Sequence, residues 1–242
     1  MALDTRANVK VALNISGTSE DTRIDLLLTA ADRMIKQHVG RDLESGTYGA
    51  SGTAIDGSIG DSGYYSGDGT INLILRQRPV TSVTSVYLDS TGYFGDNPDG
   101  SFASGTILVA GTDYVLRWDG TLPGAATRCS HVGIIKRIGG VWPEAWQYRR
   151  GSINPQAVDH IGNIKVTYVA GYTTVPADLK YALALVVAKM RMSAIYGGQS
   201  PISESYEDYS YSLEKAASAA ASAIHSIGEV QSILGRYRDV LL

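Results

Sequence analysis

One stretch of the sequence, residues 164–196 (IKVTYVAGYTTVPADLKYALALVVAKMRMSAIY), restricts the fold of this chain more than any other. Its first part is typical of a buried strand, and Gly171 follows in a turn. Pro176 suits the first turn of a helix, where its missing N–H removes no hydrogen bond, and Asp178 complements the positive helix start. The helix that follows is almost wholly apolar. The sequence therefore predicts a strand, a turn and a buried helix in succession.

Length and charge exclude several classes of protein. At 242 residues the chain can hold one or two domains with a real core. Its net charge of -3 differs from the strongly basic balance that is usual for nucleic-acid-binding domains. The longest apolar run, Tyr181–Ala188, is far below the ~18 residues that a membrane span needs. The start, MALDTRANVK, has no apolar signal segment, so we expect synthesis in a cytoplasm and no membrane partner.

An amphipathic helix is predicted over Thr18–Val39, within an N-terminal helical part that covers residues 1–45. Thr18 or Ser19 is expected to cap its start, and Gly40 stands where a left-handed C-cap belongs. The apolar residues at helical spacing are Ile24, Leu27, Leu28, Ala31, Ile35 and Val39. The polar residues expected mostly on the opposite face are Asp25, Asp32, Arg33 and Lys36. One face of this helix is therefore expected to be buried.

The middle of the chain carries β signals. Residues 46–69 are rich in Gly and Ser without periodicity, which predicts an extended loop or a loosely paired hairpin. Residues 70–163 hold short β-branched and alternating runs at regular spacing, which favour an antiparallel sandwich or small barrel over βαβ units. The predicted fold class is α+β: a small bundle of N-terminal and C-terminal helices with an inserted antiparallel β-rich domain.

The C-terminal third is expected to contain a linker and a last helix. Residues 164–212 combine the strand, the core helix and a Tyr-rich linker, SESYEDYSYS. In residues 213–242, Gly228 and Gly235 each weaken a helix by ~1 kcal/mol relative to Ala, so this helix needs a neighbour in its own subunit or in a partner. Two series of residues seven apart predict the seam of that packing: Leu213, Ala220, Ile227, Leu234 and Leu241, and Ala216, Ala223, Val230 and Tyr237.

No pattern in the sequence predicts a catalytic site. The four His residues are scattered, without metal-ligand spacing, and the lone Cys129 excludes both an intramolecular disulfide and a Cys-based zinc site. The Gly-rich stretch lacks the Gly-Lys-Ser/Thr ending of a P-loop, and no G-x-S-x-G elbow occurs. We therefore expect a protein that is not an enzyme and that binds no metal and no cofactor.

Three segments, taken in order, resemble those of one known family. The first helix closes as Ile35–Asp42 with Gly-Arg, and Leu75–Val83 contains R-P-V-T-S-V. The third segment is Val166–Tyr172, followed by a proline and Asp-Leu at a helix start. This order, with another helix after the third segment, is similar to the head-tail connector (adaptor) proteins of tailed phages. The resemblance covers roughly Thr18–Leu88 and Ile164–Tyr211.

The resemblance implies a structural virion protein in the neck, between head and tail. Connector subunits form a ring, commonly a dodecamer, beneath the portal protein, and they receive a stopper, tail-tube or terminator protein on the other side. DNA passes through the channel without specific binding. The last helix or tail of such proteins often engages the portal, which implies portal contacts at Leu213, Ile227, Leu234, Arg236, Tyr237, Arg238, Leu241 and Leu242. The Tyr-rich linker, with Tyr206, Tyr209 and Tyr211, is a candidate for the contact between subunits.

Two other functions stay open. One is a different tail-completion or minor virion structural protein. The other is a carbohydrate-binding or hydrolytic β module, because the β-rich middle of the chain contains several Tyr and Trp residues.

Overall fold

The computed structural model describes residues 3–49, 61–89, 102–124, 126–143, 162–195, 204–206, 209–211 and 227–238. The chain divides into two compact units. The described residues of the first, the helical unit, lie within 3–40 and 175–238, and those of the second, the sheet unit, lie between Arg41 and Thr174. The helices and antiparallel strands confirm the predicted α+β class.

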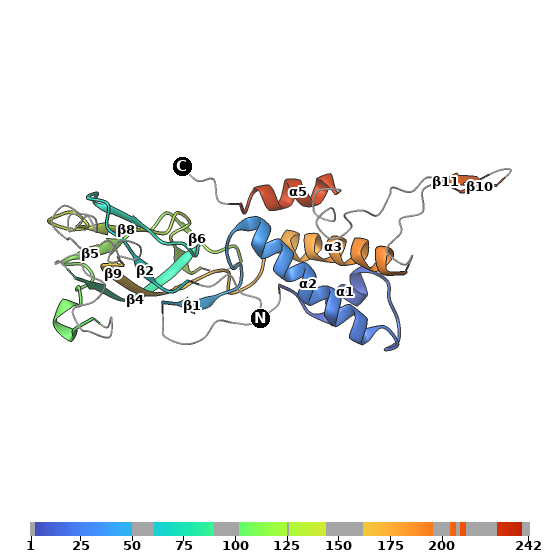
Figure 1. The fold of residues 1–242 in the computed structure, drawn as a ribbon, viewed down its shortest axis with the longest axis horizontal. Helices are drawn as coiled ribbons and strands as arrows, with labels where there is room; N and C mark the ends of the chain where they lie inside the picture. The colour runs from blue at the N-terminus through green and yellow to red at the C-terminus, as the bar shows by residue number, and fades with distance from the viewer. Residues whose placement is uncertain are drawn as a thin grey trace, which may run out of the picture. The chain divides into compact units, whose positions relative to one another are not determined.

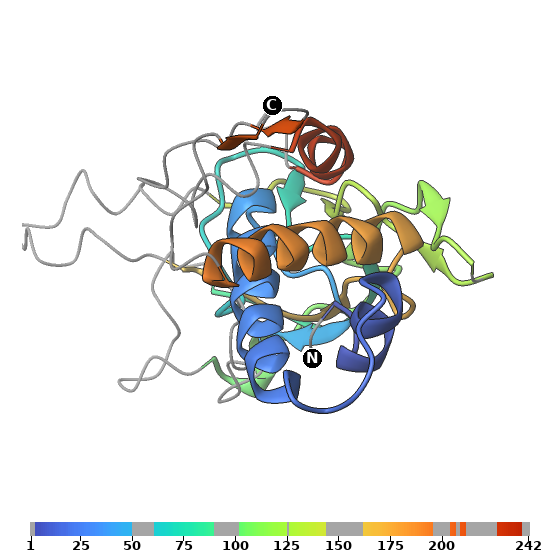
Figure 2. The ribbon, with the colours of Figure 1, turned by 90° about the vertical axis from the view of Figure 1, so that its right-hand side faces the viewer.

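The helical unit is a small bundle built on two long helices. Its described helices are α1 (Arg6–Ala12), α2 (Asp21–Val39), α3 (Ala177–Ile195) and α5 (Gly228–Gly235). Helix α3 lies across α2, and α1 and α5 each pack against both of them (Figure 2). None of the described helices is long and apolar enough to cross a membrane.

The structure confirms the predicted apolar face of α2 and the end of the helix. All six predicted apolar residues are buried, and the C-cap Gly40 has φ 84°, with its N–H donating to the Lys36 carbonyl at 2.8 Å. The predicted start is wrong. The helix begins at Asp21, and its N-cap residue Glu20 makes no side-chain cap. Thr18 takes part through its carbonyl instead, which accepts the Asp21 N–H at 3.1 Å in a preceding turn.

Two charged residues of α2 lie on its buried face, against expectation. The side chains of Asp32 and Lys36 are only 8% and 2% exposed, and Lys36 Nζ lies 2.8 Å from Asp32 Oδ2. The other carboxylate oxygen, Asp32 Oδ1, accepts the backbone N–H of Leu3 at 2.9 Å. Residues four apart are neighbours on a helix, so each charge supplies the partner that the other needs in order to be buried.

Helix α3 is the buried helix that the sequence predicts. Pro176 lies directly before its first residue, and the Pro176 carbonyl accepts the N–H groups of Leu179 and Lys180 at 3.1 and 3.2 Å. Asp178 stands in the first turn, as expected. The residues that bury the helix in the unit include Leu179, Ala182, Leu183, Val186 and Val187.

The sheet unit is organised around one central strand, β9 (Ile164–Ala170). Strand β4 (Val80–Leu88) pairs along one edge of β9 (Figure 1). Two short strands, β1 (Gly46–Tyr48) and β2 (Tyr64–Tyr65), pair in succession along the other edge. All of these pairs are antiparallel, and the alternate residues of β9 are buried.

The sheet unit is larger than the predicted insertion at 70–163. Strands β1 and β2 lie inside residues 46–69, where the sequence predicts a loop or loose hairpin, and they pair with β9 rather than with each other. Strand β9 also belongs to this unit. A strand edge leaves backbone N–H and C=O groups unpaired, and these two short segments satisfy one edge of β9. Strands of three and two residues are too short to give a periodic sequence signal.

A second sheet shares the core with the first. It contains β3 (Asn72–Ile74), β8 (Ile134–Arg137) and β5 (Tyr114–Leu116), in the order β3-β8-β5. One face of this sheet, with Leu73, packs into the same core cluster as Val166 and Trp142. The two sheets therefore enclose one hydrophobic core, as in a sandwich. Smaller described elements are a 3₁₀-helix, η1 (Ser104–Thr106), and the paired strands β6 (Gly120–Thr121) and β7 (Arg128–Cys129).

The predicted C-terminal segments are described in part. The Tyr-rich linker contains a two-stranded hairpin, β10 (Glu204–Tyr206) with β11 (Tyr209–Tyr211). The helix predicted over residues 213–242 is described only for 227–238, where α5 is helical. The other positions of the seven-residue pattern lie outside the described residues.

Candidate functional site

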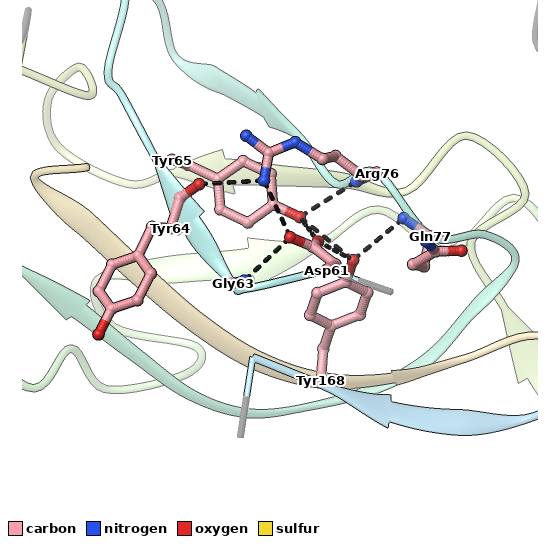
Figure 3. Close-up of polar contacts among 7 residues, drawn as sticks. All are labelled: Asp61, Gly63, Tyr64, Tyr65, Arg76, Gln77 and Tyr168. Carbon is pink, nitrogen blue, oxygen red and sulfur yellow. Dashed lines mark hydrogen bonds and ion pairs between the residues drawn. The ribbon is translucent and has the colours of Figure 1, made fainter. Parts of the chain in front are cut away.

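A cluster of polar groups surrounds the carboxylate of Asp61 in the sheet unit (Figure 3). Asp61 Oδ1 accepts the Gly63 N–H at 2.9 Å and Nη1 of Arg76 at 2.9 Å. Asp61 Oδ2 accepts the hydroxyl of Tyr168 at 2.6 Å and the hydroxyl of Tyr65. The Asp61 side chain is 0% exposed. This Asp61 cluster joins the segment before β2 to β9 and to the connection between β3 and β4.

The two tyrosine hydroxyls of the Asp61 cluster also hold that connection. The Arg76 N–H donates to Tyr65 Oη at 3.1 Å, and the Gln77 N–H donates to Tyr168 Oη at 3.0 Å. The two hydroxyl oxygens lie 3.1 Å apart. The Arg76 guanidinium carbon is 4.7 Å from the centre of the Tyr65 ring, a cation–π distance (Figure 3). Each hydroxyl therefore donates to the carboxylate and accepts from the backbone.

The chemistry of the Asp61 cluster is that of a structural clamp. Burial raises the pKa of the Tyr65 and Tyr168 hydroxyls, and the neighbouring carboxylate raises it further. The phenols therefore stay protonated as donors at neutral pH. Asp61 accepts four hydrogen bonds, about as many as its two oxygens hold. The carboxylate and both phenol protons are therefore engaged within the cluster.

Two glycines allow the chain to approach β9 closely beside the cluster. Gly49 and Gly63 have φ values of 76° and 78°. A Cβ on either would lie 1.9 or 2.5 Å from the carbonyl oxygen of Val166, and the Gly63 carbonyl accepts the Val166 N–H at 2.8 Å. Only glycine combines this backbone conformation with this contact.

The segments that carry the family resemblance meet in one hydrogen-bonded joint. The second segment contacts the other two: Gln77 Oε1 accepts the backbone N–H of Asp42, from the first segment, at 2.8 Å. The Pro79 carbonyl accepts the N–H of Gly171, from the third segment, at 2.8 Å. Asp42 and Gln77 are both buried, so their hydrogen bond is shielded from water.

The residues directly after the first segment bond to the third segment. The Tyr172 N–H donates to the Leu43 carbonyl at 2.8 Å, and the Ser45 N–H donates to the Tyr172 carbonyl at 3.0 Å. Gly171 has φ 97°, and a Cβ there would lie 2.2 Å from the Glu44 carbonyl oxygen. The Gly of the third segment is therefore required by the close passage of the chain that follows the first segment.

The structure places Leu234, one of the predicted portal contacts, inside the helical unit. Its side chain is 0% exposed, and Val230 and Ile233 are buried beside it where α5 packs on α2 and α3. The apolar face of helix α5 is therefore buried within its own chain, and the Leu234 side chain is not exposed to a partner. Ile227, at the start of the helix, is half-buried.

The end of α5 is anchored on the start of α3. Tyr237 donates its hydroxyl to Asp178 Oδ1 at 2.8 Å, and Arg236 Nη2 lies 3.3 Å from Asp178 Oδ2. Arg236 and Arg238 are exposed and Tyr237 is half-buried. Asp178 was expected to complement the helix start, and it also holds a second helix. The two arginines are the predicted portal contacts that the described structure leaves at the surface.

The remaining predicted residues are placed as follows. Tyr206, Tyr209 and Tyr211 belong to the β10–β11 hairpin. Leu213, Leu241 and Leu242 lie outside the described residues.

Sequence reasoning missed the Asp61 cluster. Asp61 lies in the Gly- and Ser-rich stretch, and Tyr168 is 107 residues away. No spacing rule connects residues so far apart. The one available signal was the high Tyr content, 15 Tyr against two Phe, which indicates hydroxyls that need partners.

The described residues contain no group of three or more His, Cys, Asp or Glu side chains that could hold a metal ion. Cys129 is buried, its Sγ lies 3.5 Å from His131 Nε2, and burial raises the pKa of its thiol. A thiol with a raised pKa is a poor nucleophile.

Comparisons with known proteins found a likeness to a solved structure. No protein-family model matches the chain, and no curated protein matches it. A solved structure that does match is the neck of an empty GTA particle, computed with C6 symmetry. The two chains are 16% identical, the match covers 98% of this chain and 89% of that one, and the TM-score is 0.46.

Proposed function

We propose that the chain is a head-tail connector: a structural subunit that forms a dodecameric ring in the neck of a tailed-phage particle. The ring joins the portal protein to a stopper, tail-tube or terminator protein and leaves a channel through which DNA passes. Its work is mechanical, and no catalytic step belongs to it.

The observation that carries this proposal is the joint between the three resembling segments. Each segment is short and common by itself. In the folded chain the second segment bonds to the other two through the Asp42–Gln77 and Gly171–Pro79 contacts. Leu43, directly after the first segment, bonds to Tyr172 of the third, and all three distances are 2.8 Å. Segments that resemble one family in order and that also contact one another in the fold support a shared architecture more strongly than three separate motifs.

The end of α5 is the part of the chain that we assign to the portal. Arg236 and Arg238 are exposed there, and the apolar face of α5 is already buried against α2 and α3. Portal binding through this end is therefore expected to be polar and sensitive to salt, because contacts between exposed charges are screened.

Binding to the portal protein of the same particle tests the proposal. Full-length protein and purified portal are mixed, and the complex is measured by light scattering after size-exclusion chromatography. We expect a complex with twelve copies of the chain, and Arg238→Glu should weaken it while the melting temperature stays unchanged. Truncation after Ser212 is a poor test by itself, because it also removes Val230 and Leu234 from the core. The matched control is Arg33→Glu, an exposed arginine of α2. Failure of the full-length protein to bind portal would sink the proposal.

One observation favours the carbohydrate-binding alternative. An open groove of about 380 Å³ lies in the sheet unit, lined in part by Tyr114 and Trp118. However, Tyr114 is buried, and the Arg128 guanidinium carbon lies 5.5 Å from the Trp118 ring centre, so a cation already stacks there. Binding of the full-length protein on a glycan array, lost in Trp118→Ala, would favour this alternative over the connector.

A further inference from the structure

The two sheets of the sheet unit each end in a strand that lines the same open groove. Strand β4 stands at the edge of the sheet around β9, and β5 stands at the edge of the β3-β8-β5 sheet. The groove, of about 380 Å³, is lined by residues that include Val83 of β4 and Val115, Leu116 and Trp118 of β5 and the residues after it. Val115 and Trp118 are 40% and 43% exposed, so the groove presents apolar surface to solvent.

The outer edge of β5 carries backbone groups without a partner at Leu116. The N–H of the next residue, Arg117, donates to the Ile134 carbonyl of β8 at 2.9 Å. In an antiparallel pair, residues that bond to the partner strand alternate with residues whose N–H and C=O point to the other side. Leu116 is of the second kind, and its backbone makes no hydrogen bond in the part of the chain that the structure describes. Such an edge is a template for a further strand.

The edge of β4 forms the opposite wall of the groove and is a poor template for pairing. Val80 and Ser130 exchange two backbone hydrogen bonds, at 2.8 and 2.7 Å, and the Val86 carbonyl accepts the Leu108 N–H at 2.8 Å. Between these points the register of β4 shifts on both sides of Val83. A shifted register interrupts regular pairing, so Val83 is assigned to the apolar wall of the groove and the pairing edge to β5.

Positive charge borders the groove at two arginines. Arg117 and Arg128 are both exposed, and the Arg128 guanidinium carbon lies 5.5 Å from the centre of the Trp118 ring. Neither arginine forms an ion pair in the described part of the chain. The nearby Asp119 does not neutralise them, because its carboxylate accepts the backbone N–H groups of residues 131 and 132. The charge of the groove is therefore complementary to a carboxylate.

We infer that this groove binds an extended segment of a partner protein, which adds to β5 as a further strand. The backbone of the segment pairs with Leu116, and its apolar side chains pack on Val83 and Trp118. Alternate residues of a strand point to opposite faces, so the residues between the apolar ones lie on the face of Arg117, where a carboxylate pairs with the guanidinium. This mode of recognition takes affinity from backbone hydrogen bonds and specificity from alternate side chains. The inference goes beyond the portal contact assigned to α5 and does not rest on it.

Binding of short labelled peptides to the full-length protein tests the inference. The probe is a fluorescein-labelled peptide of sequence VEVTVE, and fluorescence polarisation is expected to show saturable binding. Two methylated versions of the peptide test the backbone pairing: one is N-methylated at its three valines, and the other at its three polar residues. Alternate residues of a strand direct their N–H groups to opposite edges, so one version should lose binding and the other should keep it.

Variants of the protein locate the binding site. Trp118→Ala should lower the affinity about tenfold, as expected for an aromatic anchor, and Arg117→Glu should lower it by up to about fivefold. A peptide with Lys in place of Glu should bind Arg117→Glu more tightly than it binds the unaltered protein. The matched control is Arg33→Glu, at an exposed position of α2, which should leave the affinity unchanged. Melting temperatures show whether each variant keeps its fold.

Several outcomes would overturn the inference. They are the absence of saturable binding, equal binding of the two methylated peptides, and an affinity that Trp118→Ala leaves unchanged. Self-association of the full-length chain that Trp118→Ala abolishes, without peptide binding, would assign the groove to a second copy. Glycan binding that the same variant abolishes, again without peptide binding, would assign the groove to carbohydrate.

Discussion

The ammonium of Lys36 and the carboxylate of Asp32 lie 2.8 Å apart inside the helical unit, one helical turn from each other on α2. Both side chains are shielded from water, and Asp32 also accepts the N–H of Leu3. The pair therefore fixes the N-terminal segment on α2 as well as balancing two buried charges.

Removing one member of this buried pair is expected to destabilise the folded protein. Asp32→Ala should lower the free energy of unfolding by about 3–5 kcal/mol, because it removes the carboxylate that pairs with the buried Lys36 ammonium and accepts the Leu3 N–H. Urea denaturation measures the loss. The control is Asp25→Ala, which breaks the exposed Arg6–Asp25 pair at 2.6 Å and should cost less than about 1 kcal/mol. Equal losses in the two variants would show that the Asp32 charge is not effectively buried.

The Asp61 cluster predicts a hydroxyl-specific effect. Tyr168→Phe should destabilise the protein by about 1–3 kcal/mol, because it strips a donor from Asp61 and an acceptor from the Gln77 N–H. Tyr114→Phe is the matched control. Tyr114 is also buried, but its hydroxyl has no hydrogen-bond partner in the part of the chain that the structure describes. Chemical denaturation of both variants should show a loss for Tyr168→Phe alone, and a similar loss for Tyr114→Phe would contradict the clamp.

Two glycines with similar backbone angles should respond differently to alanine. Gly49 and Gly111 have φ 76° and 83°, but a Cβ at Gly49 would lie 1.9 Å from the Val166 carbonyl oxygen, and one at Gly111 meets nothing within 4 Å. Gly111→Ala should cost about 1 kcal/mol from its backbone conformation alone. Gly49→Ala should cost a further ~1–3 kcal/mol from overpacking. Thermal melts compare them, and a smaller effect at Gly49 would mean that β1 does not pass β9 as closely as described.

Alkaline pH is expected to unfold the sheet unit. Burial raises the pKa of Tyr48, Tyr65 and Tyr168 above the ordinary value of 10.0. Above that value the unfolded chain releases protons that the folded chain keeps, so stability falls as pH rises, by up to about 1.4 kcal/mol per pH unit for each group. Below pH 10 these tyrosines are protonated in both the folded and the unfolded chain, so they contribute no pH dependence to the stability.

Tyrosinate absorbance and circular dichroism, followed together in a titration, check this prediction. Ionisation of the buried tyrosines should coincide with loss of the sheet signal. Their ionisation at an ordinary pKa, with the fold intact, would show that the hydroxyls are accessible to water. The Tyr168→Phe variant should shift the transition, because it removes one of the three groups.

The predictable parts of the structure are those encoded by neighbours along the chain. The period of Ile24, Leu28 and Ala31 predicts the buried face of α2, and Gly40 predicts its end. Pro176 and Asp178 predict the start of α3. These features depend on backbone preferences and on side chains within one or two turns, which a sequence displays directly.

The sequence predicts which residues belong to the candidate interaction sites, but not which parts of the protein surround them. The seven-residue pattern identifies Leu234 and Val230 as seam residues, and both are buried in a helix packing as that pattern requires. The pattern does not say whether the seam faces its own subunit or a partner, and in the structure these two residues face α2 and α3 of the same chain. The Tyr-rich linker was recognised by composition, whereas the pairing of Tyr206 with Tyr209 required the strand register.

By itself, the sequence determined the α+β class, the course of α2, β9 and α3, and the local geometry at Gly40 and Pro176. Only the tertiary structure decided that β1 and β2 complete the edge of β9, and that Asp61 is clamped by a tyrosine 107 residues away. The physical reason is the sequence separation over which each effect acts. Propensity and periodicity act between residues a few positions apart, while a buried charge or an open strand edge is satisfied by whichever distant groups the fold brings to it.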